Sequence, residues 1–159
     1  MFYFSNFLKV TWHKYIWHKR FALKYSSYAW LAVLDGLKSV EVPAKRNIFI
    51  NLTCPLFEEE NESITHLFFQ CDFSFQILRI LMPDVETFLL RPTLLQFFNF
   101  FYEVHWYKSH DKNFSFSMVC YLVYFIWRER NQRRFSRKQA SPITLYRLVI
   151  SAISFKATR

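Results

Sequence analysis

Glycine is almost absent from this chain, and its absence limits the folds that the chain can adopt. Gly36 is the single glycine among 159 residues. Tight hairpin turns need residues at positive φ, a region that glycine enters without steric cost. Helices need such residues only at their ends. Hydrophobic residues make up 52% of the chain and include 20 Phe, a composition that excludes intrinsic disorder. We therefore predict a mainly α-helical fold with little sheet.

The spacing of apolar residues and the positions of capping residues predict about six helices. Gly36 is predicted to end one helix in the left-handed conformation, Asp72 to cap another, and Ser141 to cap the last, with Pro142 in its first turn. The apolar face predicted for that last helix consists of Ile143, Tyr146, Ile150 and Ile153. The segments predicted to be helical are 12–19, 28–34, 63–69, 73–81, 93–107, 114–135 and the segment from 142 onward.

Three metal-ligating side chains occur with a spacing typical of a zinc site. Cys54, His66 and Cys71 form the pattern Cys-x-x-Phe…His-x4-Cys. A structural zinc site usually has four ligands, commonly opened by two cysteines that are separated by two residues. Phe57 occupies the position of the second cysteine, and a phenyl ring cannot coordinate a metal. The sequence leaves two interpretations open here, an irregular loop that binds zinc and a metal-free loop. An oxygen ligand can come from the acidic residues Glu58, Glu59 and Glu60.

The chain is strongly basic, and six of its 21 cations lie within one run of eleven residues. The net charge is +9 at pH 7, which favours nucleic acid, RNA or DNA, or an anionic membrane as a partner. This run can bind phosphates, with Trp127 and Phe135 as stacking surfaces. It can equally be the solvated end of a helix, where cations complement the helix dipole. The six cations of the run are Arg128, Arg130, Arg133, Arg134, Arg137 and Lys138.

The sequence carries no evident catalytic constellation. It has no glycine-rich phosphate loop and no Tyr-x-Asp-Asp motif, and its 12 acidic residues form no set suited to bind two metal ions. We predict neither enzymatic activity nor a small-molecule substrate. The longest uncharged run, residues 113–127, has 15 residues, whereas a membrane span needs about 20. Because the N-terminus also lacks the features of a signal peptide, we expect an intracellular protein, in nucleus or cytoplasm, that is neither secreted nor bound to a membrane.

Several segments together resemble a known family. They are Trp12-His13-x-x-Ile16-Trp17, the segment 28–37, Cys54-Pro55-Leu56-Phe57, and Glu62-Ser63-x-x-His66-Leu67-Phe68-Phe69-x-Cys71. In this order they resemble the zinc-binding domain that follows reverse transcriptase in plant LINE-type (non-LTR) retrotransposons. The stretch 124–135 is similar to the segment that follows that domain. The resemblance implies a ligand pattern Cys-x-x-Cys…His-x4-Cys, in which Cys54, His66 and Cys71 are ligands and Phe57 departs from the pattern.

The resemblance also implies a domain organisation and a function. Residues 12–82 would be the reverse-transcriptase-type zinc-binding domain, and residues 83–159 a helical C-terminal segment with the basic run. Polymerase and nuclease activities of the family lie in neighbouring domains. The expected function is therefore that of a non-catalytic accessory domain associated with nucleic acid. The alternative is a structural remnant or protein-interaction domain that binds neither zinc nor nucleic acid, which the missing ligand and the aromatic excess favour.

Overall fold

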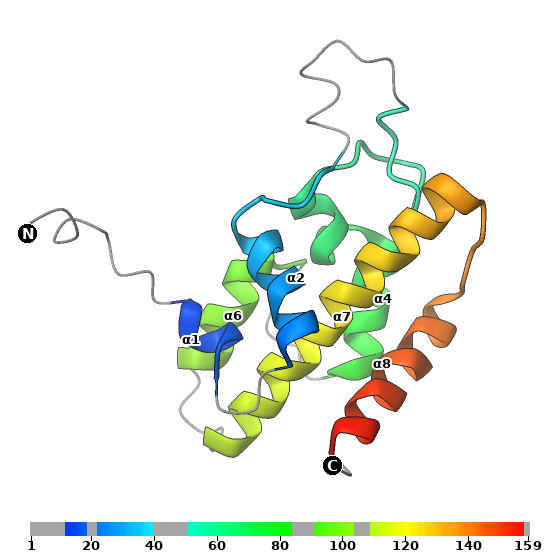
Figure 1. The fold of residues 1–159 in the computed structure, drawn as a ribbon. Helices are drawn as coiled ribbons and strands as arrows, with labels where there is room; N and C mark the ends of the chain where they lie inside the picture. The colour runs from blue at the N-terminus through cyan, green and yellow to red at the C-terminus, as the bar shows by residue number, and fades with distance from the viewer. Residues whose placement is uncertain (1–11, 19–21, 40–50, 84–90, 104–108, 158–159) are drawn as a thin grey trace, which may run out of the picture.

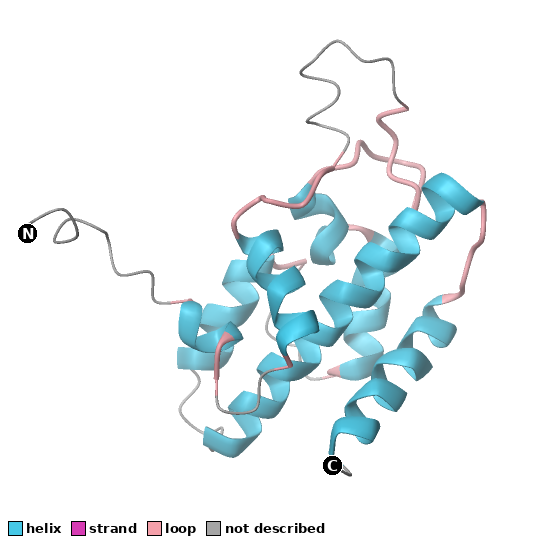
Figure 2. Ribbon diagram, viewed as in Figure 1, coloured by secondary structure: helices cyan, strands magenta, loops and turns pink. Residues whose placement is uncertain are grey.

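The computed structural model describes residues 12–18, 22–39, 51–83, 91–103 and 109–157, and these residues are mainly helical (Figures 1 and 2). Within them, extended pairing is limited to a single antiparallel bridge between Thr53 and Asn61. The predicted fold class is therefore confirmed. The helical elements are α1 (His13–Ile16), α2 (Leu23–Val33), η1 (His66–Gln70), α4 (Asp72–Leu81), α6 (Leu94–Glu103), α7 (Ser109–Ser136) and α8 (Pro142–Ala157).

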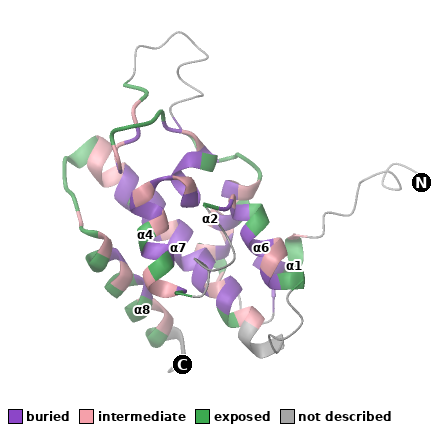
Figure 3. Ribbon diagram, turned by 180° about the vertical axis from the view of Figure 1, so that it is seen from behind, coloured by how far each residue is buried: buried purple, intermediate pink, exposed green. Residues whose placement is uncertain are grey.

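The long helix α7 is the centre of the fold. It has 28 residues and packs against α1, α2, α6, α8 and η1, so that neighbours cover it on several sides (Figure 1). Most residues from 115 to 127 are consequently buried (Figure 3). An apolar segment surrounded in this way needs no polar face, which explains the uncharged run of the sequence. No helix in the described ranges is long and apolar enough to cross a membrane.

Phenylalanine and tyrosine rings fill the core where α1, α6 and α7 meet. Tyr15 packs against Phe98 and Phe116, with ring centroids 5.9 and 5.2 Å apart. Phe97 contacts Phe69 of η1 at 5.7 Å. Aromatic pairs at these separations are favourable beyond the area they bury. The aromatic excess of the chain is therefore used largely in the core, which residues from both predicted parts of the chain form together.

The C-terminus of α2 uses its glycine differently from the prediction. Asp35, and not Gly36, has positive φ, at 53°. The N–H of Gly36 donates to Leu31 O at 2.7 Å and that of Asp35 to Ala32 O at 3.2 Å, the two bonds of a Schellman motif. A Cβ at Gly36 would lie 3.1 Å from Cδ2 of Leu31. Glycine therefore lets the turn approach the helix closely, because any side chain here would press on Leu31.

The start of α2 also differs from the prediction. The helix begins at Leu23, five residues before the predicted start at residue 28. Ser26, a residue type that often caps helices, is buried inside this one, and Ser27 Oγ donates to Leu23 O at 2.8 Å. Serine can form this bond within a helix as well as cap one, so the residue type alone did not fix the boundary.

Two other helix starts follow the side-chain chemistry of their caps. Ser141 Oγ accepts the N–H of Thr144 at 3.2 Å, which confirms the predicted cap of α8. At the start of α6, Thr93 and Gln96 exchange hydrogen bonds between side chain and backbone, at 2.9 and 3.2 Å, as a capping box does. The predicted helix 93–107 is observed as far as Glu103, and the residues after it lie outside the described part.

The predicted apolar face of α8 is wrong in two positions. The helix packs against α4 and α7, and the residues that it buries there are Leu145 and Val149. Ile143 is 46% exposed and Ile150 is 37% exposed. Tyr146 and Ile153, the other two predicted residues, are partly buried against the core.

Candidate metal centre

Cys54, His66 and Cys71 converge in the structure. All three are buried, and one ligand atom from each lies within 4.8 Å of the other two. The Sγ atoms of Cys54 and Cys71 are 4.0 Å apart. Two thiolates bound to one tetrahedral zinc ion at about 2.3 Å would be about 3.8 Å apart. The three side chains that the sequence spacing pointed to therefore meet in space, and the distance between the two sulfurs suits a shared ion.

The two cysteines have the same local environment although they lie in different elements. Cys54 begins the turn after Thr53, and its Sγ accepts the backbone N–H groups of the residues two and three positions later, Leu56 and Phe57. Cys71, and not Asp72 as predicted, is the N-cap residue of α4. The backbone N–H groups of Phe73 and Ser74 face its Sγ in the same relation, without a capping hydrogen bond. N–H groups aimed at sulfur stabilise a thiolate, which is the form that binds metal.

His66 is presented by η1, a helical turn that is interrupted just before Cys71. Ser63 Oγ accepts the N–H of His66 at 2.9 Å, and His66 O accepts the N–H of Cys71 at 2.7 Å. Phe69 lies between these two ligands with φ at 81°, which a bulky residue adopts only at a cost of about 1–3 kcal/mol. The N–H of Phe69 donates to Ser74 Oγ at 3.1 Å. The predicted helix 63–69 is thus a shorter and distorted turn.

The His66 imidazole is the strongest indication that this cluster suits a metal ion. Neither Nδ1 nor Nε2 has a hydrogen-bond partner within the described part of the chain, and both atoms are buried. Glu60 Oε2 approaches Nδ1 to 3.1 Å, but without the direction of a hydrogen bond. Buried polar atoms are almost always paired, and each unpaired one costs about 1–3 kcal/mol. A metal ion bound to one of these nitrogens would remove that cost, so the donor set fits zinc.

The Sγ atoms of Cys54 and Cys71 share a hydrogen bond, which moves the pKa values of the two thiols apart. The hydrogen bond from Cys71 lowers the pKa of Cys54 to about 6, and the N–H groups of the turn add to this effect against the opposing effect of burial. The same hydrogen bond and burial raise the pKa of Cys71. One thiolate therefore forms readily beside one thiol. Cys120, the remaining cysteine, is buried away from this cluster in α7, and burial raises its pKa to about 12.

Three cations of the basic run bind the ligand loop, residues 51–62, instead of facing solvent. Arg130 donates to both carboxylate oxygens of Glu62, at 2.9 and 2.5 Å. Arg134 donates to the same carboxylate at 2.9 Å and to Thr53 O at 3.1 Å. Arg133 donates to Leu56 O at 3.0 Å. The C-terminal half of α7 is therefore fastened to the loop that carries Cys54.

These contacts narrow the predicted phosphate-binding set. The side chains of Arg130, Arg133 and Arg134 donate hydrogen bonds to other groups of the protein. These three arginines therefore fit neither alternative predicted from the sequence, phosphate binding or a solvated helix end. Arg128, Arg137 and Lys138 are exposed.

Glu62 is a structural residue that the sequence did not single out. Its side chain is only 2% exposed and lies between two guanidinium groups. The sequence places it at the end of an acidic run with Glu58, Glu59 and Glu60, which are all exposed. Nothing in the run itself separates the buried glutamate from the other three, because its partners come from α7.

Phe57 lies where the fourth ligand would be expected. Its ring is partly buried and packs against the core, while its backbone N–H faces Cys54 Sγ. The turn that normally holds two cysteines is therefore retained with one cysteine and one phenyl ring.

Comparison with protein families gives a match over the part of the chain that holds this cluster. Residues 2–77 match the family described as zinc-binding in reverse transcriptase. This segment is therefore a reverse transcriptase zinc-binding domain. Neither the curated proteins nor the solved structures include a match to the chain. The matched segment contains all three ligand residues, whereas α6, α7 and α8 follow it.

Proposed function

We propose that the protein is a non-catalytic accessory domain that binds zinc and associates with nucleic acid. The observation that carries the zinc part is the buried His66 imidazole, which has no hydrogen-bond partner among the described residues and lies beside two thiols. The match of residues 2–77 to a zinc-binding family supports it. An origin in a plant LINE-type element is part of the same proposal, supported by the resemblance of the segments quoted above.

In this proposal zinc is held by the sulfurs of Cys54 and Cys71 and by one imidazole nitrogen of His66. Zinc supplies no redox chemistry here, and its role is to cross-link the chain. The two cysteines come from the ligand loop and from the start of α4, and His66 comes from η1. A shared ion would therefore fix the loop to the helical core, in addition to the arginines of α7.

Glu60 is the acidic residue placed to complete the coordination shell. Its Oε2 lies 3.1 Å from Nδ1 of His66, a separation close to the ~3.3 Å between two ligand atoms on one tetrahedral zinc ion. The contact lacks hydrogen-bond geometry, as expected for two groups that face a common third partner. Glu60 is exposed, and its carboxylate does not belong to the group of ligand atoms that lie within 4.8 Å of one another. It would therefore have to turn toward the sulfurs to supply the fourth ligand in place of the missing cysteine.

The second candidate function is a metal-free structural or protein-interaction domain. The contacts of Arg130 and Arg134 with Glu62 favour it, because they hold the ligand loop without any metal. Zinc content distinguishes the two candidates. Protein purified without chelator is expected to contain one zinc per chain, and cobalt substitution is expected to give the absorption of a tetrahedral thiolate site.

The matched variants for this test are Cys71→Ala and Cys120→Ala. Both remove a buried thiol, but only Cys71 belongs to the cluster. We expect Cys71→Ala to lose zinc and the cobalt absorption, and Cys120→Ala to keep both. The absence of zinc from the parent protein would favour the metal-free candidate, and equal zinc content in the two variants would mean that Cys71 is not a ligand.

The nucleic-acid part of the proposal is supported by charge. The chain carries a net charge of +9, and Arg128, Arg137 and Lys138 are exposed at the end of α7. Binding through phosphates weakens steeply as salt rises, with a slope set by the number of contacts. A binding titration at several salt concentrations is expected to show this slope, and a flat or absent response would contradict the proposal. The intracellular location is supported by the three free cysteines, all of them buried thiols.

A further inference from the structure

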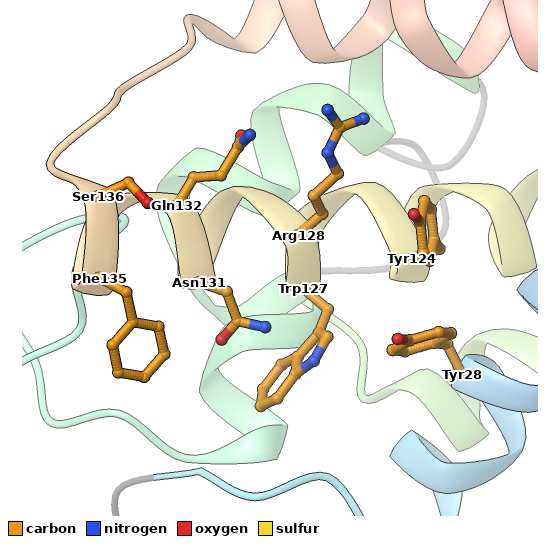
Figure 4. Close-up of a pocket in the computed structure, with 8 residues that line it drawn as sticks. All are labelled: Tyr28, Tyr124, Trp127, Arg128, Asn131, Gln132, Phe135 and Ser136. Atoms are coloured by element: carbon orange, nitrogen blue, oxygen red, sulfur yellow. The ribbon is translucent and has the colours of Figure 1, made fainter.

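A shallow groove runs along the C-terminal half of α7 on the side that faces α2. Its volume is about 400 Å³. Figure 4 shows Trp127, Asn131 and Phe135 projecting from the same side of α7, with Tyr28 of α2 beside Trp127. The residues of α7 recur at intervals of four, which places them on one face of the helix. The groove is therefore a continuous surface and is separate from the metal cluster.

Four of the eight residues that line this groove are aromatic, and they differ in exposure. Phe135 is 76% exposed, more than the other phenylalanines that the structure describes. Trp127 is nearly buried, and the guanidinium of Arg130 covers its ring at 4.8 Å. Tyr124 and Tyr28 meet edge to face with centroids 5.1 Å apart. The groove thus offers one exposed ring at one end and fixed rings at the other.

Polar groups between the rings are oriented by the protein. Asn131 Oδ1 accepts the N–H of Arg130 at 2.7 Å, which leaves the amide N–H groups of Asn131 to donate elsewhere. Gln132 also lines the groove. Amides can bond to the edges of nucleobases when the bases are not paired.

Cations lie at both ends of the groove. The ammonium of Lys24 is 4.4 Å from the centroid of the Tyr124 ring, and Arg128 lines the groove and is exposed. Arg137 and Lys138 follow Phe135 within three residues and are also exposed. This charge is complementary to a phosphate backbone that passes along the aromatic face.

We propose that this groove binds a single-stranded nucleic acid, with an unpaired base stacked on Phe135 and a phosphate bound by Arg128. The proposal rests on the nucleic-acid association proposed above and names the site and the form of the ligand. A duplex does not suit the groove, because rings reach base faces only where bases are unstacked.

The test uses the full chain and a fluorescein-labelled oligo(U) RNA of about 12 nucleotides, within the range of single-strand site sizes. Fluorescence anisotropy gives its Kd for the parent protein and for Phe135→Ala, Phe135→Trp and Arg128→Ala. Stacking on one aromatic side chain changes affinity by about 5- to 100-fold. We expect Phe135→Ala to weaken binding by that factor. Phe135→Trp keeps an aromatic ring and is expected to bind as the parent protein does. Arg128→Ala is expected to weaken binding and to reduce the salt slope by about one.

Phe155→Ala and Arg147→Ala are the controls, because both residues are exposed on α8, away from the groove. Their Kd values are expected to stay within about twofold of the parent, and circular dichroism checks that every variant is folded. If the parent protein binds oligo(U) but Phe135→Ala behaves like Phe155→Ala, the groove proposal is overturned while nucleic-acid association stands. If the parent binds neither oligo(U) nor an RNA duplex, single-stranded DNA or a DNA duplex at low salt, both proposals fail. Duplex binding with the same loss on Phe135→Ala would overturn the stacking role.

Discussion

Replacing Phe57 with cysteine adds a thiol to the turn that already carries Cys54. The two residues are joined by a hydrogen bond from the N–H of Phe57 to Cys54 Sγ, so a side chain at this position begins beside the candidate metal cluster. A fourth thiolate would complete a tetrahedral shell in place of the exposed Glu60 carboxylate. We therefore expect Phe57→Cys to bind zinc more tightly than the parent protein.

Two opposing contributions set the size of the effect on stability. Phe57 is only partly buried, so removing its ring should cost about 1–2 kcal/mol, less than the ~3–5 kcal/mol of a fully buried Phe. A hundredfold lower Kd for zinc, at a zinc concentration that saturates both proteins, stabilises the folded state by about 2.7 kcal/mol. The net gain of about 1 kcal/mol raises Tm by roughly 2–4 °C for a chain of this size. With chelator only the cost remains, and Tm falls.

Thermal unfolding followed by circular dichroism measures both the packing cost and the stabilisation by zinc. The parent, Phe57→Cys and Phe57→Ala are each unfolded with micromolar zinc and with chelator. Phe57→Ala loses the same ring but gains no ligand, so it isolates the packing cost. The reasoning is refuted if zinc raises the Tm of Phe57→Cys no more than that of Phe57→Ala. That result would mean that residue 57 does not face the metal.

Glu62→Gln is expected to destabilise the protein by about 3–5 kcal/mol in urea unfolding, because Arg130 is left as a buried charge without its carboxylate. The control Asp72→Asn, which removes an exposed ion pair with Arg91, should cost less than about 1 kcal/mol, and similar losses for both variants would contradict the structural role of Glu62. On α8, Leu145→Ala should cost about 2–5 kcal/mol as a buried truncation. Ile143→Ala, at an exposed position, should stay within about 1 kcal/mol, and the reverse order would mean that α8 packs on the face predicted from the sequence.

The candidate ligands could be found from the sequence, because ligand type and spacing are local properties of the chain. Cys54, His66 and Cys71 were identified in this way, and they converge. The placement of Glu60 against His66 and the burial of Glu62 could not be found, since both depend on contacts made after the loop closes on its neighbours. The sequence does not show which of the four acidic residues in this run is buried, because burial depends on tertiary contacts.

Composition and short-range capping determined the helical class and the start of α8 at Ser141, because these depend on residues within one turn of each other. Tertiary structure decided which face of α8 is buried. The helix carries two apolar stripes with nearly equal periodicity, and the contacts with α4 and α7 select the one that includes Leu145. Tertiary structure also decided the role of two arginines of α7. In the sequence, Arg130 and Arg134 are indistinguishable from the other cations of the basic run. Glu62 is 68 residues away from Arg130 in the sequence, and the fold brings its carboxylate against both arginines. The arginines and the glutamate can be buried together because each charge is paired with an opposite one.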